Sequence, residues 1–217
     1  MKIETATQLA DACRAAAEKK TLYVYGAYGF PLHEENKQRI WKGYAYNRKP
    51  ERKEKIDAAD ADTFGFDCVC LIKALLWGWT GNASKTYGGA TYGSNGVSDI
   101  GADQIINVCK DVSTNFSKVA VGELLWMKGH VGIYIGDGLA VECTPSWKNC
   151  VQITAVHNIG QKAGYNGRSW TKHGKLPYVT YDAAPEASVA PAASLEVKSV
   201  SGLPVLQKGS KGASVKA

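Results

Sequence analysis

Hydrophobic residues recur every three or four positions through the first half of the chain. Residues 5–20 have this spacing behind a threonine that can cap a first turn, so they predict a helix, and residues 32–44 predict a second. The aromatic and glycine-rich residues 21–31 predict a short extended segment and a tight turn. Further helices are predicted over the apolar residues 66–79 and over residues 98–112.

The pattern changes after residue 120, where short runs rich in β-branched residues are separated by glycines. Residues 122–156 predict three or four antiparallel strands, and residues 173–181 predict a last one. Helices followed by a strand meander are typical of the α+β class, so we expect an α+β fold.

The composition supports one folded domain of catalytic size. With 217 residues, 45% of them hydrophobic, the chain can bury one real core. Its first twenty residues contain no apolar block long enough for a signal peptide, and no later run reaches membrane-spanning length. We therefore expect a protein that is made in the cytoplasm and does not insert stably into a membrane.

The basic charge of the chain suits an anionic partner but does not identify which one. A formal net charge of +6 suits an anionic partner such as nucleic acid, a membrane surface or the bacterial wall. The basic run at residues 48–55 is interleaved with glutamates and has no neighbouring aromatic residue for base stacking. It predicts a solvated surface loop or helix rather than a nucleic-acid contact.

The composition changes again after Tyr181. Residues 182–194 are rich in Ala, Pro and Ser and predict a linker between domains. Residues 195–217 are too short to fold alone and look like the start of a further module. The predicted domains are therefore a catalytic-sized domain over residues 1–181, the linker, and a partial module.

Two of the six cysteines stand one residue apart at the head of the predicted helix 66–79. The first turn of a helix lowers the pKa of a thiol through its unpaired N–H groups and dipole, and Cys68 follows the helix start that Asp67 marks. Cys70 lies about 200° further round the axis, so we expect one cysteine to be free for chemistry and the other to pack. The alternative is that both are small core residues. No metal or cofactor is expected, because Cys68 and Cys70 lack a second suitably spaced Cys or His pair.

A base for such a thiol must come from one of four histidines. His33 and His157 lie in charged or loop-like surroundings and predict surface residues, whereas His173 starts a strand and stays open. His130 stands at the start of a strand between glycines that let other groups approach closely. In that strand it faces away from the aliphatic residues. His130 is therefore the candidate base.

Glu142 is a carboxylate in the next predicted strand, and the register of the hairpin decides whether it faces His130. A two-residue turn at Asp137 and Gly138 pairs Ile133 with Glu142 and points the carboxylate away. A three-residue loop with a bulge pairs Gly132 with Glu142 and places it diagonally from His130. We favour the second register, because an unpaired inward carboxylate is costly.

Two interpretations follow from these residues. Cys68, His130 and Glu142 can form the nucleophile, base and orienting acid of a thiol hydrolase. Alternatively, they are a structural cysteine, a satisfied histidine and a solvent-facing glutamate.

Three motifs resemble those of a known family. "YVYGAYG" (23–29), "FDCVCLI" (66–72) and "GHVGIYIGDG" (129–138) are similar, in order and separation, to motifs of the NlpC family of bacterial cell-wall cysteine peptidases. These are relatives of the CHAP amidases and have a papain-like core. The resemblance covers roughly residues 5–181, and it implies N-terminal helices with a central nucleophile helix packed on an antiparallel sheet.

The resemblance also implies roles for individual residues. Cys68 is the nucleophile, His130 the base and Glu142 the third polar residue, a place where the family often has His. Tyr23 matches the tyrosine near the developing oxyanion, and Asp67 matches a residue that in some members contacts the stem peptide. The sequence departs from the family pattern in having Val69 after the nucleophile and a longer segment before Asp67.

The function implied by this resemblance is hydrolysis of peptidoglycan. We expect cleavage of an amide bond in the stem peptide, of the D-Glu–diamino acid endopeptidase type, through a thioester on Cys68. The alternatives are an N-acetylmuramoyl-L-alanine amidase and a catalytically inactive wall-binding protein. Residues 203–217 resemble the opening of a peptidoglycan-binding module, so we expect a monomeric phage or prophage lysin that reaches the wall after release from the cytoplasm.

Overall fold

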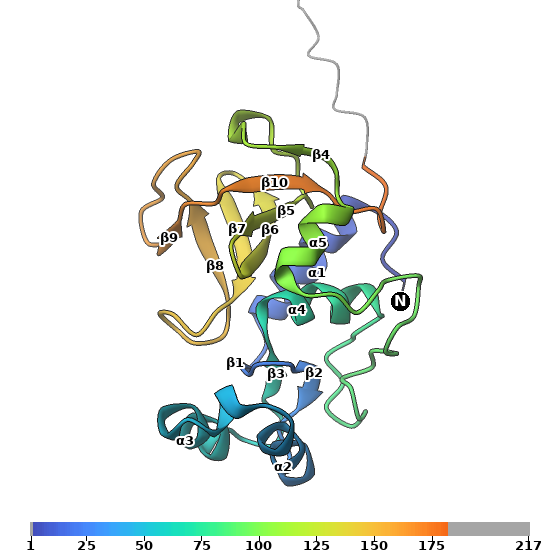
Figure 1. Cartoon of the computed structure of the whole chain (residues 1–217), viewed down its shortest axis with the longest axis vertical. Coiled ribbons are helices and arrows are strands. Elements are labelled where there is room, and N and C mark those ends of the chain that lie inside the picture. The colour runs from blue at the N-terminus through green and yellow to red at the C-terminus, as the bar shows by residue number, and fades with distance from the viewer. Residues whose placement is uncertain (1, 182–217) are drawn as a thin grey trace, which may run out of the picture. The chain divides into compact units, whose positions relative to one another are not determined.

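Five α-helices and two β-sheets make up residues 2–181, the part of the chain that the structure describes (Figure 1). This computed structural model has helices α1 (Ala6–Ala17), α2 (Glu34–Gly43), α3 (Pro50–Ala58), α4 (Cys68–Leu76) and α5 (Ala102–Val108), and 3-10 helices η1 (Ala45–Arg48) and η2 (Phe116–Lys118). The predicted α+β class is confirmed.

The strands form a large and a small sheet. Their bounds are β1 (Thr21–Tyr23), β2 (Tyr28–Pro31), β3 (Phe64–Phe66), β4 (Lys110–Ser113), β5 (Leu124–Met127), β6 (His130–Gly136), β7 (Leu139–Cys143), β8 (Val151–Val156), β9 (Gly167–Arg168) and β10 (Lys172–Lys175). The large sheet has the order β4-β10-β5-β6-β7-β8-β9, and the small sheet has the order β1-β3-β2. Strands β5 to β8 form the predicted antiparallel meander.

Helix α1 begins where the sequence predicts it. The Gln8 amide donates to Thr5 Oγ1 at 3.1 Å, and the Thr5 amide donates to Gln8 Oε1 at 3.2 Å, which completes a capping box. The buried face of α1 carries Leu9, Ala10 and Cys13 and packs against α4 and strands β6 to β8. Burial of this amphipathic face fixes the helix on the large sheet.

Helix α4 is the central element of the fold. All nine of its residues are buried, as expected for a helix that is apolar nearly all round, and it packs against α1, β2, β6 and β7 (Figure 1). It is followed by Gly78, which has a positive φ of 87°. The start of α4 is thereby held between the small sheet and the strands of the large one.

The segment between β2 and β3 packs on the small sheet through a second, smaller core. This core consists of Val24, Ala27, Phe30, Leu32, Ile40 and Ile56. Helix α3 contains most of the basic run 48–55, and its charged residues are exposed as predicted, with one exception. Arg52 is only 5% exposed, so the prediction of a solvated run is wrong at this position.

Two predicted helices have different ends in the structure. Residues 110–113 form β4 rather than the end of a helix, because the chain becomes extended at Cys109 and pairs with β10. The predicted helix 66–79 begins at Cys68, because residues 64–66 form β3 between β1 and β2. A strand of three residues has too little alternation to be detected in the sequence.

The prediction on membrane insertion, the state of the cysteines and the predicted domain boundaries can each be compared only with the described residues. Among the described residues, no helix is long and apolar enough to cross a membrane. All six cysteines are free thiols, including Cys143 and Cys150. The predicted linker and partial module, residues 182–194 and 195–217, lie outside the described residues.

Candidate active site

Asp67 caps α4 and joins it to the segment that follows β1. Its Oδ1 accepts a hydrogen bond from the Cys70 amide at 2.7 Å, and its Oδ2 accepts one from the Gly26 amide at 2.8 Å. Burial raises the pKa of this carboxyl, while the two amide hydrogen bonds act in the opposite direction. Asp67 therefore fixes the first turn of α4, and with it Cys68, against the segment after β1.

Cys68 is the first residue of α4 and lines a cavity of about 630 Å³. Other lining residues come from β1 and the segment after it, from the end of α2, from the first turns of α4, and from α5 with the loop before it. They include Tyr23, Tyr44, Cys70, Asp99 and Asp103. Tyr44 and Tyr92, which also line the cavity, are 41% and 54% exposed. The cysteine thus faces an open cleft with aromatic and acidic walls.

The sulfur of Cys68 lies against the start of β6. Burial, together with the charge of Asp67, raises the pKa of the Cys68 thiol to about 12, and hydrogen bonds from backbone amides, the Val131 amide first among them, lower it. The Val131 amide belongs to the residue that follows His130. The resting group is therefore a protonated thiol, and it needs a base to become a nucleophile.

His130 is the first residue of β6, and its ring is held at one edge and one face. Its Nε2 donates to Glu142 Oε2 at 2.6 Å. The ring stacks on Trp170, with centroids 5.5 Å apart and planes 11° from parallel. These contacts leave Nδ1 as the ring nitrogen that can accept a proton.

The register of the β6–β7 hairpin places Glu142 on the face of His130. Ile133 pairs with Val141, so Gly132 stands opposite Glu142, as in the register that the sequence analysis favours. The turn itself differs from that expectation. Asp137 and Gly138 form a two-residue turn, both with positive φ, and a bulge between Tyr134 and Gly136 corrects the register.

Glu142 is almost fully buried and has two partners besides His130. Thr154 Oγ1 donates to its Oε1 at 2.7 Å, and Arg168 Nε donates to its Oε2 at 2.9 Å and to its Oε1 at 3.2 Å. Burial favours the neutral acid, but the hydrogen bonds and charges of His130 and Arg168 outweigh it and lower the pKa of Glu142. The carboxylate stays ionised and can stabilise a positive charge on His130.

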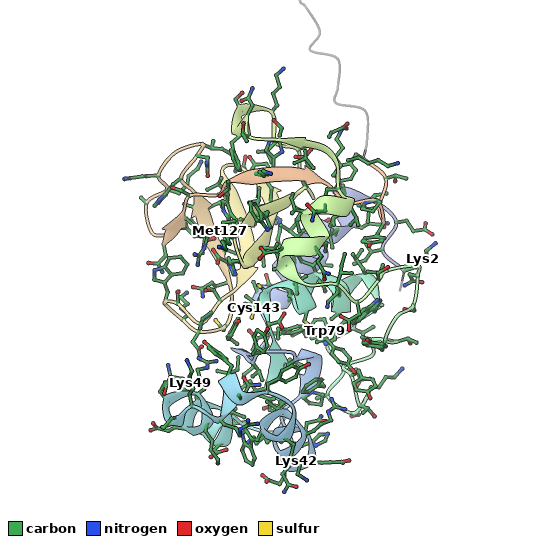
Figure 2. All side chains as sticks on the ribbon, in the orientation of Figure 1. Lys2, Lys42, Lys49, Trp79, Met127 and Cys143 are labelled. Carbon is green, nitrogen blue, oxygen red and sulfur yellow. The ribbon has the colours of Figure 1, made fainter. Side chains whose placement is uncertain are left out.

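Three residues of this site are absent from the sequence analysis. Gln152 and Thr154 alternate with apolar residues along β8, and this alternation is a signal once the β7–β8 register is known. Arg168 sits in a strand of two residues after a glycine-containing loop, and Trp170 follows it, so neither has a periodic pattern to identify it. The central carbon of the Arg168 guanidinium also lies 4.9 Å from the centroid of the Trp147 ring. Arg168 Nη1 lies 3.8 Å from the sulfur of Met127, which is labelled in Figure 2.

Tyr23 ends β1 and shares the cavity with Cys68. Burial first, and then the charges of Cys68 and Asp67, raise the pKa of the Tyr23 phenol far above its usual range. The hydroxyl is therefore always protonated and can only donate to an anion that forms nearby. Among the described residues, the structure brings Tyr23 and Asp67 to the cavity of Cys68, and His130 and Glu142 to the strands beside it.

Cys70 does not have the separate environment that the helical spacing predicts. It lines the same cavity as Cys68 and is equally buried, because the cavity extends around the first turn of α4. Burial raises the pKa of the Cys70 thiol well above its usual range, and Asp67 adds to this shift. A third cysteine, Cys143, packs below the helix start and donates to the Phe66 carbonyl at 3.3 Å (Figure 2).

The remaining histidines lie outside this site. His173, which the sequence analysis leaves open, is buried, and its Nδ1 bonds to Glu123 while its Nε2 donates to the Asn115 carbonyl at 3.1 Å. This pair joins β10 to the start of β5. His157 is exposed and His33 precedes α2 at the surface, as predicted.

Neither a metal site in the described residues nor the comparison with known proteins assigns a function to this site. Within residues 2–181 no group of three or more His, Cys, Asp or Glu side chains could hold a metal ion. Comparison with protein-family models gives no match, and comparison with the sequences of curated proteins also gives none.

Proposed function

We propose that this protein is a cysteine hydrolase that cleaves an amide bond in the peptidoglycan stem peptide, with a papain-like fold of the NlpC type. One observation carries the proposal. A cysteine at the first position of a buried helix has its sulfur at the Val131 amide, next to a histidine whose far nitrogen is bonded to a buried, ionised glutamate. The order of nucleophile, base and acid along the chain supports the same conclusion.

The first chemical step joins the Cys68 sulfur to the substrate. His130 Nδ1 takes the thiol proton as Sγ attacks the carbonyl carbon, and Glu142 stabilises the imidazolium that forms. This coupled transfer suits a thiol whose pKa is raised to about 12, because little thiolate exists before the substrate binds. The oxyanion accepts hydrogen bonds from the Cys68 amide and the Tyr23 hydroxyl.

The second half of the reaction releases both products. As the tetrahedral intermediate collapses, the carbon–nitrogen bond breaks and His130 gives its proton to the leaving amine. A thioester on Cys68 remains. His130 then removes a proton from water, which attacks the thioester, and returns a proton to the Cys68 sulfur when the new carboxyl group leaves.

The bacterial wall is the substrate that best fits the charge of the chain and the resemblance of its motifs. The formal net charge of +6 favours adsorption to a polyanionic wall. The cleft beside Cys68 has tyrosines on one wall and Asp99 and Asp103 on another, which suits a polar peptide with apolar parts. We propose cleavage between D-Glu and the diamino acid.

Product analysis tests this assignment against its rivals. Purified sacculi are digested, and the released fragments are identified by mass spectrometry. New amino termini on the diamino acid support the endopeptidase, whereas glycan chains stripped of intact stem peptides would make the protein an N-acetylmuramoyl-L-alanine amidase. Binding to sacculi without any released fragment would make it a wall-binding protein.

A further inference from the structure

The backbone of residues 23–26 is held by three polar side chains from elsewhere in the chain. Arg52 Nη2 donates to the Tyr23 carbonyl. Asn47 accepts from the Tyr25 amide at 3.1 Å and donates to the Tyr25 carbonyl at 2.9 Å. Asp67 accepts from the Gly26 amide. Arg52 and Asn47 both come from the segment between β2 and β3, so this segment supports a wall of the cleft.

Arg52 closes a ring of hydrogen bonds around Tyr23. Its Nη1 donates to Asn149 Oδ1 at 2.5 Å, and the Asn149 carbonyl accepts from the Tyr23 amide at 2.9 Å. The relative exposures of Arg52, Asn149 and Tyr23 are 5%, 5% and 8%. Both backbone polar groups of Tyr23 are thereby occupied by two residues that also bond to each other.

The Arg52 guanidinium also supports the ring of Tyr23. Its central carbon lies 5.3 Å from the centroid of the Tyr23 ring and 5.7 Å from that of the Tyr46 ring. The two tyrosine rings meet edge to face, with centroids 6.2 Å apart. One cation therefore contacts the backbone and the ring face of the residue that lines the cavity with Cys68.

Stability alone is a weak reason to bury a guanidinium at this position. Removing a cation from water costs several kcal/mol, and well-packed apolar residues often stabilise a fold as well as a buried ion does. What a guanidinium adds, when both Nη1 and Nη2 are bonded as in Arg52, is a fixed geometry, since its planar set of donors allows few arrangements. The residue whose position Arg52 fixes is Tyr23.

We propose that Arg52 is a positioning residue for the reaction at Cys68, which acts by holding the Tyr23 hydroxyl where the oxyanion develops. The inference rests on the proposed function. Asn149, in the loop between β7 and β8, is the second member of this clamp. Since the hydroxyl bonds more strongly to the oxyanion than to the ground-state carbonyl, loss of the clamp lowers kcat more than it raises KM.

The test compares four single variants on soluble muropeptides released from purified sacculi by a muramidase. Arg52→Met removes the clamp, and Arg52→Lys keeps the charge and part of the hydrogen bonding. Asn149→Gly removes the side chain that accepts from Arg52 and keeps the backbone carbonyl that accepts from Tyr23. Glycine also tolerates the positive φ of 56° at this position. Lys55→Met removes an exposed cation from the same helix and is the matched control.

We expect Arg52→Met to lower kcat by about 10- to 100-fold with KM changed by less than about threefold, and Arg52→Lys to restore part of the loss. Asn149→Gly should give a smaller loss, because the bond from Arg52 to the Tyr23 carbonyl is left in place. Thermal unfolding of each variant is measured in parallel, and activities are compared well below every Tm. If Arg52→Met does not fold, Arg52→Lys and Asn149→Gly carry the same comparison.

The inference is overturned if Arg52→Met and Asn149→Gly keep the kcat of the wild type, or if they lose no more than Lys55→Met does. It is also overturned if each loss of kcat equals the unfolded fraction of that variant. An active wild type with unchanged clamp variants contradicts this inference alone. A folded wild type that releases no product contradicts the proposed function as well.

Discussion

Glu142 sets the electrostatics of the site because it carries a negative charge in a buried position. Burial alone would neutralise it, and His130 on β6 and Arg168 on β9 keep it ionised. Thr154 on β8 donates a further hydrogen bond to it. Since Arg168 shares the carboxylate with His130, Glu142 can orient the imidazole without holding a proton itself.

Replacing Glu142 by Gln tests this arrangement. The amide keeps the shape but loses the charge that stabilises the imidazolium, so kcat on muropeptides should fall by about 10²- to 10⁴-fold. Thr154→Val is the matched control, because it removes a neutral donor to the same carboxylate. An equal loss in both variants would contradict an electrostatic role for Glu142.

Glu142→Gln also tests how the free energy of unfolding depends on pH in the acid range. The pKa of Glu142 is lowered from its ordinary value of 4.5, so its charge stabilises the folded protein above that pH, and the contribution is lost as the pH falls through the folded pKa. In urea unfolding, the difference in free energy between wild type and Glu142→Gln should shrink as the pH falls below 4.5. A difference that stays constant with pH would show that folding does not shift the pKa of Glu142, and a difference that grows as the pH falls would show that the folded protein favours the neutral acid.

The Cys68 thiol provides a second prediction at the residue scale. Because burial and Asp67 raise its pKa to about 12, its alkylation by iodoacetamide should accelerate continuously as the pH is raised from neutral. The modified residue is identified by mass spectrometry, since Cys109 and Cys150 are less buried than Cys68. A rate that is already maximal in acid would instead indicate a preformed thiolate–imidazolium pair.

At the scale of elements, strand β6 holds His130 between Glu142 and Trp170, and Gly132 on the same strand leaves room for Trp170. A Cβ at Gly132 would lie 3.0 Å from the Trp170 ring and 3.0 Å from the Val141 carbonyl. Trp170 stacks on His130 and is buried, so it has little room to move. Gly132 thus permits Trp170 to stack on His130.

Gly132→Ala should therefore disturb both stability and catalysis. We expect a loss of about 1–3 kcal/mol in the free energy of unfolding, as for other overpacked cores, together with a lower kcat because Trp170 is displaced from His130. Gly43→Ala is the control, since a Cβ at Gly43 meets nothing within 4 Å. If Gly132→Ala has the stability and kcat of the control, Trp170 does not fix the imidazole.

The elements that the sequence predicts well are those with a local pattern. The capped helix α1, the apolar helix α4 and the strands β5 to β8 follow from spacing and turn residues. The parallel pairing of β1 with β3 could not be predicted, because each strand has three residues and about forty residues separate them. The register of the β6–β7 hairpin was predicted, but the position of the bulge was not, because the sequence analysis places the extra residue in the loop and the structure places it between Tyr134 and Gly136.

At the scale of the whole described unit, residues 2–181, both of its ends are tied to the same place. The Ala6 amide donates to the Thr180 carbonyl at 2.8 Å, and the Thr180 amide donates to the Glu4 carbonyl at 2.8 Å. Tyr181 donates to the Gly122 carbonyl at 3.0 Å and accepts from the Leu176 amide at 2.9 Å. These contacts join residues 4–6 to residue 180 and place Tyr181 beside β5.

The candidate site draws on most of this unit, and this explains which of its residues the sequence could suggest. Cys68, His130 and Glu142 stand in motifs whose local chemistry is readable. Arg52 and Arg168 occur in charged or irregular segments, where a surface position is the ordinary expectation. Only long-range packing buries Arg52 and half-buries Arg168, so coordinates are needed to identify them.

The most direct test of the account is the rate at which purified sacculi lose turbidity with the wild type, Cys68→Ala and Cys70→Ala. The two cysteines line one cavity and are equally buried, so each variant is a control for the other. The account predicts a loss of several orders of magnitude for Cys68→Ala and a rate within about tenfold of the wild type for Cys70→Ala. Clearing of the walls by Cys68→Ala at the wild-type rate would contradict it.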